Sequence, residues 1–115
     1  MESELEKRTL TDSLTDVSNR FAFLERMNNL LESSTNLSHD VKHAVFFLDL
    51  DRFKQVNETL GHTYGDLLLI EIARRIQALL KNKDILARYG SDEFIITLTN
   101  IVHPNEAAKF AEKVI

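Results

Sequence analysis

The chain has 115 residues, 43% of them hydrophobic, which is enough for one core and too few for two ordinary domains. Fourteen Lys and Arg against 18 Asp and Glu give a formal net charge of −4, and the basic residues do not cluster, so nucleic-acid binding is not expected. The absence of cysteine excludes disulfides, cysteine zinc sites and a thiol nucleophile, and suits a cytoplasmic domain. No apolar run approaches the roughly 18 residues that cross a bilayer, so any membrane attachment is expected outside this chain.

The N-terminal region is charged and has few apolar positions. Residues 1–12 are expected to be the end of a connecting or signalling helix, which leaves 13–115 as the domain itself. The next segment predicts a helix over 21–31, because its apolar residues recur at i, i+4, i+7 and i+8. Ser18 and Asn19 precede this helix as candidate caps.

The middle of the chain alternates between strand and helix patterns. The polar residues of 32–43 favour a surface loop. The continuous apolar run 44–48 predicts a strand covered on both faces, at the centre of the sheet. A short helical stretch then ends near Gly61, and apolar spacing over 69–80 predicts a longer helix packed on the sheet.

The C-terminal part contains a hairpin pattern. The β-compatible runs 85–89 and 94–99 are separated by Gly90, Ser91 and two carboxylates, and Gly90 is expected to supply the positive φ of a tight turn. Pro104 then opens a last helix. This order of elements predicts an α/β fold, an α+β sandwich in which at least one sheet edge lacks a partner.

Four separated stretches of the chain resemble the GGDEF-type diguanylate cyclase family. They are 10–20 (LTDSLTDVSNR), 48–57 (LDLDRFKQVN), 60–66 (LGHTYGD) and 88–94 (RYGSDEF), and together they match the family's order and spacing. The resemblance implies a nucleotidyl-cyclase or polymerase-palm-like fold, with a central antiparallel sheet flanked by helices. It also implies condensation of two GTP into cyclic di-GMP and two pyrophosphates, in a bacterial second-messenger pathway. Members continue beyond the point at which this chain stops, so the domain is expected to be incomplete at its C-terminus.

Joining a ribose 3′-hydroxyl to an α-phosphate requires divalent cations that neutralise the triphosphate. The resemblance implies Mg²⁺ (or Mn²⁺) held by Asp49, Asp92 and the backbone carbonyl of Leu50, with Asp92 and Glu93 as the catalytic residues. Isolated acids near a turn are more often simply solvated, but the surrounding motifs favour the metal site. Asp51 is placed to face the same site or to cap the following helix.

The same resemblance assigns the substrate contacts. An amide and a carboxylate suit the donors and acceptor of guanine, so Asn57 and Asp66 match the family's guanine readers, with helix-end capping as the alternative. Lys54 and the backbone of Phe53 lie at a helix start, where phosphate is favoured. His62 is expected at the substrate edge or in a structural role. The remaining histidines, expected to be surface loop residues, are His39, His43 and His103.

Two departures from the family pattern stand out. Ser91 replaces a glycine of the hairpin that, with Gly90, lets phosphate approach the backbone; a negative φ at Ser91 costs little, whereas a positive φ costs about 1 to 2 kcal/mol. The family's inhibitory Arg-x-x-Asp is here Lys81 to Asp84, and lysine lacks the planar fork of arginine. These two residues form a degenerate inhibitory site or a solvated helix end.

Each GTP hydroxyl must meet the α-phosphate of the other GTP, so activity is expected from a homodimer. The alternative is a catalytically degenerate regulatory module that binds GTP or cyclic di-GMP, and a purely structural dimerisation domain is a third possibility. Fused sensor or effector domains are expected in the full-length protein. The expected location is the cytoplasm, or the cytoplasmic part of a membrane-anchored protein.

Overall fold

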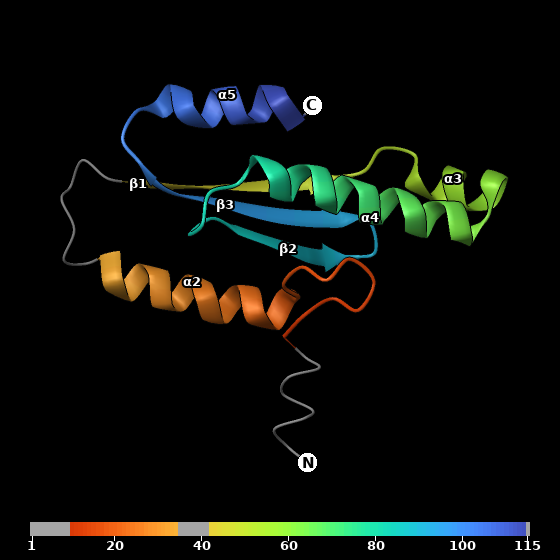
Figure 1. The fold of residues 1–115 in the computed structure, drawn as a ribbon, viewed down its shortest axis with the longest axis horizontal. Coiled ribbons are helices and arrows are strands. Elements are labelled where there is room, and N and C mark those ends of the chain that lie inside the picture. The colour runs from red at the N-terminus through yellow and green to blue at the C-terminus, as the bar shows by residue number, and fades with distance from the viewer. Residues whose placement is uncertain (1–9, 35–41, 115) are drawn as a thin grey trace, which may run out of the picture.

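The computed structural model describes residues 10–34 and 42–114 (Figure 1). The connecting helix expected over 1–12 lies almost wholly outside the described residues, and so does His39. The described chain begins as a loop, and the N–H of Ala22 donates to Oδ1 of Asn19 at 2.9 Å, which confirms Asn19 as a helix cap. This loop contacts the sheet through an isolated bridge between Ser18 and Ala87.

The sheet has three antiparallel strands in the order β1-β3-β2. They are β1 (Lys42–Asp49), β2 (Ile85–Gly90) and β3 (Glu93–Ile101). The prediction that 44–48 forms the sheet centre is wrong for the described strands, since β3 lies in the middle. β1 is also not covered on both faces, because Val45 is 45% exposed and Phe47 is 74% exposed.

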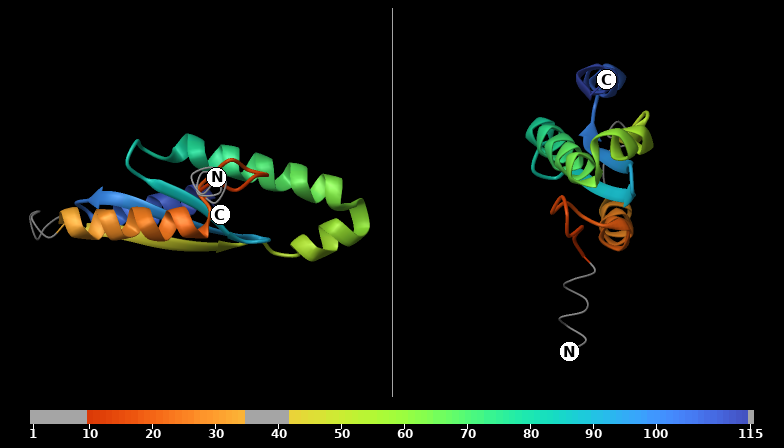
Figure 2. Two further views of the ribbon diagram at one scale, coloured as in Figure 1. Left: turned by 90° about the horizontal axis from the view of Figure 1, so that it is seen from below. Right: turned by 90° about the vertical axis from the view of Figure 1, so that its right-hand side faces the viewer.

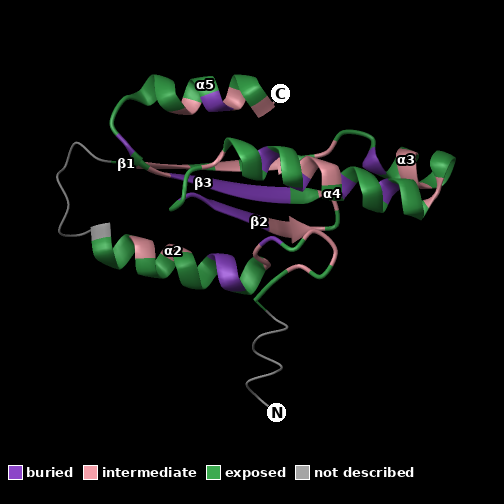
Figure 3. Cartoon of the chain, viewed as in Figure 1, coloured by how far each residue is buried: buried purple, intermediate pink, exposed green. Residues whose placement is uncertain are grey.

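Helices cover the two faces of the sheet unequally (Figures 2 and 3). The helix α2 (Arg20–Ser34) lies on one face, where Phe23 packs with the strand residues Ile85 and Ile95. On the other face, α4 (His62–Leu79) and α5 (Pro104–Val114) enclose the larger core. The predicted helices and the α+β sandwich are confirmed. Among the helices that the structure describes, none has both the length and the apolar character of a membrane span.

A helical pair extends beyond the hairpin end of the sheet (Figure 1). The helix α3 (Phe53–Leu60) follows β1 and is joined to α4 at Gly61, whose φ of 95° is in the region that favours glycine. The ring of Phe53 is buried in the core and anchors the start of α3. The predicted end of a helical stretch near Gly61 is therefore confirmed, and the pair is held beside the end of β1.

Two histidine expectations have different outcomes. His43 is not a loop residue: it lies in β1, half-buried, and its Nδ1 accepts a hydrogen bond from the N–H of Asn100 at 3.1 Å. His103 is exposed in the bend before α5, as expected.

Candidate active site

The hairpin turn consists of Ser91 and Asp92. The strands pair up to Gly90 and Glu93, which are register partners. Neither turn residue has a positive φ, and Gly90 does not either, so the expected role for Gly90 is wrong. The strand register shifts between Arg88 and Gly90, and this irregularity in β2 lets the chain reverse without a left-handed residue in the turn. Ser91 is therefore in the conformation that costs little.

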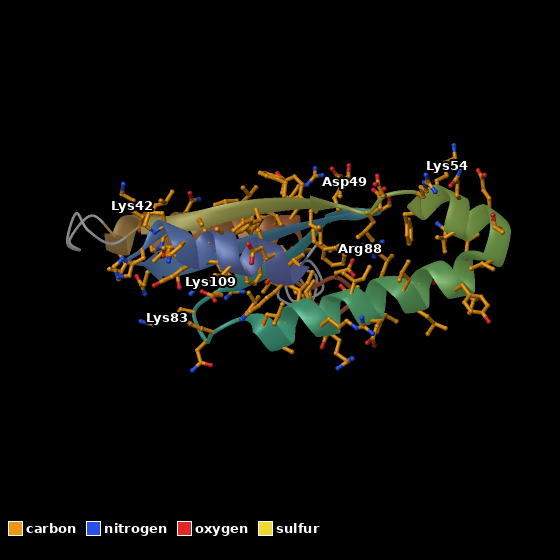
Figure 4. All side chains as sticks on the ribbon, turned by 90° about the horizontal axis from the view of Figure 1, so that it is seen from above. Lys42, Asp49, Lys54, Lys83, Arg88 and Lys109 are labelled. Atoms are coloured by element: carbon orange, nitrogen blue, oxygen red, sulfur yellow. The ribbon has the colours of Figure 1, made fainter. Side chains whose placement is uncertain are left out.

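The end of β1 meets this hairpin. Asp49 lies directly opposite Glu93 in the register, so the two side chains leave the same face of the sheet. The N–H of Leu50 donates to the backbone oxygen of Asp92 at 3.1 Å. Figure 4 shows Asp49 at the end of β1, with its side chain directed outward. The four residues predicted for the metal and the chemistry are thus brought together.

The carboxylates at this point remain accessible. Asp49 and Glu93 are exposed and Asp92 is half-buried. A Cβ at Gly90 would overlap the Glu93 carboxylate, so glycine lets that side chain lie across the backbone of β2. Within 10–34 and 42–114, no three His, Cys, Asp or Glu side chains are already grouped as a metal-ligand set. The metal ligands therefore stay a prediction.

The predicted guanine readers lie where α3 crosses α4. A Cβ at Gly65 would overlap Oδ1 of Asn57 and approach the ring of Phe53, so Gly65 gives the Asn57 amide its place. Asp66, the next residue of α4, is exposed. Neither α3 nor α4 begins with a hydrogen bond from a capping side chain. The structure therefore gives no support to the alternative that Asn57, Asp66 or Asp51 caps a helix start.

One amide oxygen at this crossing is unusual. Oδ1 of Asn57 is buried and has no hydrogen-bond partner among the described residues. A buried acceptor without a partner costs about 1 to 3 kcal/mol, so a reason for its position is required. Oδ1 lies where a Cβ at residue 65 would stand, so the close crossing of α3 and α4 holds it there.

The start of α3 offers backbone donors. Arg52 precedes the helix in a left-handed conformation, with φ 59° and no side-chain cap. The first N–H groups of a helix have no partner within the helix, so those of Phe53 and Lys54 are suited to an anion. Lys54 is exposed and points outward in Figure 4, and His62 is exposed at the first position of α4.

The residues predicted for an inhibitory site have a different arrangement. Asp84 is only 7% exposed, so its description as part of a solvated helix end is wrong. Its carboxylate accepts hydrogen bonds from the N–H of Lys81 at 2.9 Å, the N–H of Thr99 at 2.9 Å and the Thr99 hydroxyl at 3.1 Å. Both oxygens are therefore occupied, Oδ2 by the turn at Lys81 and Oδ1 by Thr99 of β3. Lys81 is exposed, and ligand binding here stays a prediction.

Sequence reasoning missed an arginine and its carboxylate partner. Nη1 of Arg88 lies 3.3 Å from Oδ1 of Asp12, and both side chains are largely buried. The N–H and hydroxyl of Thr15 also donate to Asp12, at 2.9 and 2.7 Å. Burial raises the pKa of Asp12, but the Thr15 hydrogen bonds and the charge of Arg88 outweigh it and hold that pKa below its ordinary value. Both residues stand in the motif stretches 10–20 and 88–94, which was the only available signal.

Comparison with known proteins agrees with this geometry. The family model for "Diguanylate cyclase, GGDEF domain" matches residues 9–115. The bifunctional diguanylate cyclase/cyclic di-GMP phosphodiesterase MucR of Pseudomonas aeruginosa is 42% identical over 112 residues, which are 97% of this chain and 16% of MucR. The diguanylate cyclase TpbB of the same species is 39% identical over 90% of this chain and 23% of TpbB. The chain therefore spans less than a quarter of these relatives.

Solved structures have the same fold. The GGDEF domain of TpbB from Pseudomonas aeruginosa superposes with a TM-score of 0.83 and 38% identity, over 90% of this chain and 59% of that one. The coiled coil and GGDEF domain of DgcB from Caulobacter crescentus, in complex with c-di-GMP, gives a TM-score of 0.86 and 25% identity, over 98% of this chain and 58% of that one. With the family model matching nearly the whole chain, these likenesses show that the chain belongs to the GGDEF family of diguanylate cyclase domains.

Proposed function

We propose that this domain condenses two GTP molecules into cyclic di-GMP and two pyrophosphates. The observation that supports it most is the meeting of β1 with the hairpin, where the Asp49 and Glu93 pair adjoins the backbone bond between Leu50 and Asp92. MucR and TpbB, both named as diguanylate cyclases, match 97% and 90% of the chain, which supports the same activity. Their greater length supports fused sensor or effector domains in the full-length protein.

The acidic residues of this site suit a hard divalent cation. We assign Asp49, Asp92 and the carbonyl of Leu50 to Mg²⁺ or Mn²⁺, with Glu93 beside them, because such cations prefer oxygen ligands. Like charges placed directly opposite each other on adjacent strands are unfavourable, so the Asp49 and Glu93 pair would be relieved by a cation. When bound, the cation would supply charge neutralisation at the triphosphate and make the attacking hydroxyl easier to deprotonate.

The helical pair suits guanine recognition. Guanine presents two donors and one acceptor along its edge, which a carboxylate and an amide can bind together. Asp66 would accept from the guanine N–H groups, and the Asn57 amide would complete the pattern. The placement of the Asn57 amide against Gly65, the neighbour of the exposed Asp66, supports this role.

The phosphates are assigned to the region between α3 and the hairpin. The N–H groups at the start of α3, beginning with Phe53, and the ammonium of Lys54 would bind them. The backbone at Gly90 and Ser91 would lie along the same phosphates, with His62 at the edge of the nucleotide. Each domain holds one GTP, so two copies must face each other for both bonds to form.

The test is incubation of the purified full-length protein with GTP and Mg²⁺, with mass spectrometry to detect cyclic di-GMP. The wild type is expected to make product, and Asp92→Asn is expected to make none, because it removes a ligand charge without changing shape. Asp16→Asn is the matched control: Asp16 is an exposed loop residue with φ 64°, a conformation that asparagine tolerates.

Two outcomes would contradict the proposal. Wild-type turnover in the Asp92→Asn variant would remove Asp92 from the site. A wild type that binds GTP or cyclic di-GMP without turnover would instead favour the regulatory module.

A further inference from the structure

The side chain of Arg88 connects the N-terminal loop to the hairpin turn. Nη1 lies 3.3 Å from each carboxylate oxygen of Asp12, and Nη2 donates to the backbone oxygen of Ser91 at 2.8 Å. The backbone of Arg88 is held as well, since its N–H donates to the oxygen of Ser18 at 2.9 Å. Figure 4 shows Arg88 directed to the α4 side of the strands. One residue thus joins segments that are far apart in the sequence.

The turn needs such support. Two-residue hairpin loops that match the strand twist have residues with positive φ, and neither Ser91 nor Asp92 does. The backbone oxygen of Ser91 is instead held by Arg88, and that of Tyr89 accepts from Nη2 of Arg20 at 2.9 Å. Two arginines therefore hold the hairpin through its carbonyl groups.

The position of Arg88 is itself specified by Asp12. The Asp12 carboxylate accepts two hydrogen bonds from Thr15. The backbone N–H of Asp12 donates to the backbone oxygen of Val17 at 2.7 Å. Nε of Arg88 is buried without a partner among the described residues, so this guanidinium bonds through its terminal nitrogens. The orientation of the Arg88 guanidinium therefore satisfies Asp12 and the Ser91 carbonyl and leaves Nε without a hydrogen bond.

We propose that Arg88 is a positioning residue for the cyclase reaction, oriented by Asp12, that holds the Ser91 and Asp92 turn against the end of β1. This inference rests on the proposed function. Its physical basis is that Asp92 follows the carbonyl held by Arg88, and its own oxygen accepts the N–H of Leu50, next to Asp49. A loosened turn would misplace the hairpin acids relative to Asp49 while leaving the guanine site on α3 and α4 in place.

The test compares Arg88→Lys and Asp12→Asn with the wild type. Lysine keeps the charge but cannot bond Asp12 and the Ser91 carbonyl with one planar fork. Asparagine can still accept from Thr15 but has no charge for Arg88. Both variants are expected to lower kcat about 100-fold, with KM for GTP nearly unchanged, because misplacement of reacting groups by about 1 Å has an effect of that size. The double variant should be no worse than the more damaging single one.

A readout independent of activity is the hydrogen exchange rate of the Leu50 amide, measured by NMR. In both variants it should rise, while an amide in the middle of β3, such as that of Ile96, keeps its wild-type rate. The matched control is Arg74→Lys, which alters an exposed arginine paired with Glu71 and should leave kcat and both exchange rates unchanged. If Arg88→Lys does not fold, Asp12→Asn alone gives the same test.

Several results would overturn the inference. Unchanged Leu50 exchange would mean that Arg88 does not hold the turn. Equal acceleration at Leu50 and Ile96 would mean that Arg88 stabilises the fold as a whole and not the turn in particular. A wild type without cyclase activity would defeat the proposed function but not this test, because the exchange rates still decide whether Arg88 and Asp12 hold the turn.

Discussion

At the scale of single residues, Asp12 is expected to make folding stability depend on pH. Hydrogen bonds from Thr15 and the charge of Arg88 hold its folded-state pKa below the ordinary value of 3.8, despite the opposing effect of burial. A depressed carboxyl pKa stabilises the fold fully above the unfolded-state value, and this stabilisation is lost as the pH falls through the folded-state value. The relevant window is therefore below pH 3.8.

At pH 7 the Asp12→Asn variant should have a lower free energy of unfolding than the wild type, measured by urea denaturation followed by circular dichroism. The difference should shrink as the pH falls below 3.8, because the wild-type carboxylate becomes protonated. A difference that stays constant with pH would mean that the Asp12 charge does not stabilise the fold.

Ser91 illustrates a limit of motif comparison. A serine in place of the family glycine raises the question of a strained turn, but its φ is negative and its side chain is exposed. The backbone constraint at this turn thus comes from the register shift in β2 and from Arg88. We infer that Ser91 does not by itself oppose catalysis.

At the scale of elements, local patterns predicted the helices and the hairpin well. Phe23 and Met27, one turn apart, both face the sheet from α2, and the residues after Pro104 form α5. The role of β1 was mispredicted because a continuous apolar run is the same for a covered strand and for an edge strand. Only pairing distinguishes the two, and pairing depends on distant residues.

The site shows the same division. The family motifs identified Asp49, Asn57, Asp66 and Asp92, and the fold brings the metal candidates to one end of the sheet. The contact between Asp12 and Arg88 could not be predicted, because 76 residues separate them and the motif stretches that contain them do not indicate which side chains pair. Its geometry depends on how the N-terminal loop packs on β2.

The crossing of α3 and α4 gives a prediction about nucleotide choice. In Gly65→Ala, the new Cβ would displace the Asn57 amide, and GTP binding should weaken much more than ATP binding, because only guanine presents the pattern assigned to Asn57 and Asp66. Titration of each nucleotide by calorimetry would measure this. Gly61→Ala is the control: its Cβ would contact nothing, so it should lower stability through its φ of 95° without changing nucleotide preference.

Equal losses of GTP and ATP affinity in Gly65→Ala would contradict the guanine assignment. They would mean that the helix crossing supports the site only through its packing.

At the scale of the whole molecule, one part of the sheet is incompletely covered. Among the described strands β1 has a single partner, and the rings of Phe47 and Tyr89 meet edge-on at 6.3 Å while Phe47 stays 74% exposed. The GGDEF domain of TpbB is longer, since this chain matches only 59% of it. This chain therefore spans little more than half of that domain, and among the described residues the face of β1 around Phe47 stays largely exposed.

The cyclase rate of this 115-residue chain can be compared with that of a chimera, in which the remaining part of the TpbB GGDEF domain follows the chain. The chain alone is expected to fold but to make cyclic di-GMP at least about 100-fold more slowly. Lys54 is the only side-chain cation that we assign to the phosphates in the described residues. A charge-assisted contact contributes about 1.5 to 3 kcal/mol, so two such contacts supplied by the added TpbB segment would lower the barrier by about 3 kcal/mol or more.

Circular dichroism would first confirm that both proteins are folded, and product would then be measured at equal GTP and Mg²⁺. The Asp92→Asn variant of the chimera sets the background. Because the β1 edge is unpaired among the described strands, the chain alone should also unfold at a lower urea concentration than the chimera. A folded chain that matches the rate of the chimera would show that the phosphate contacts lie within these residues and that our assignment of Lys54 as the main one is wrong.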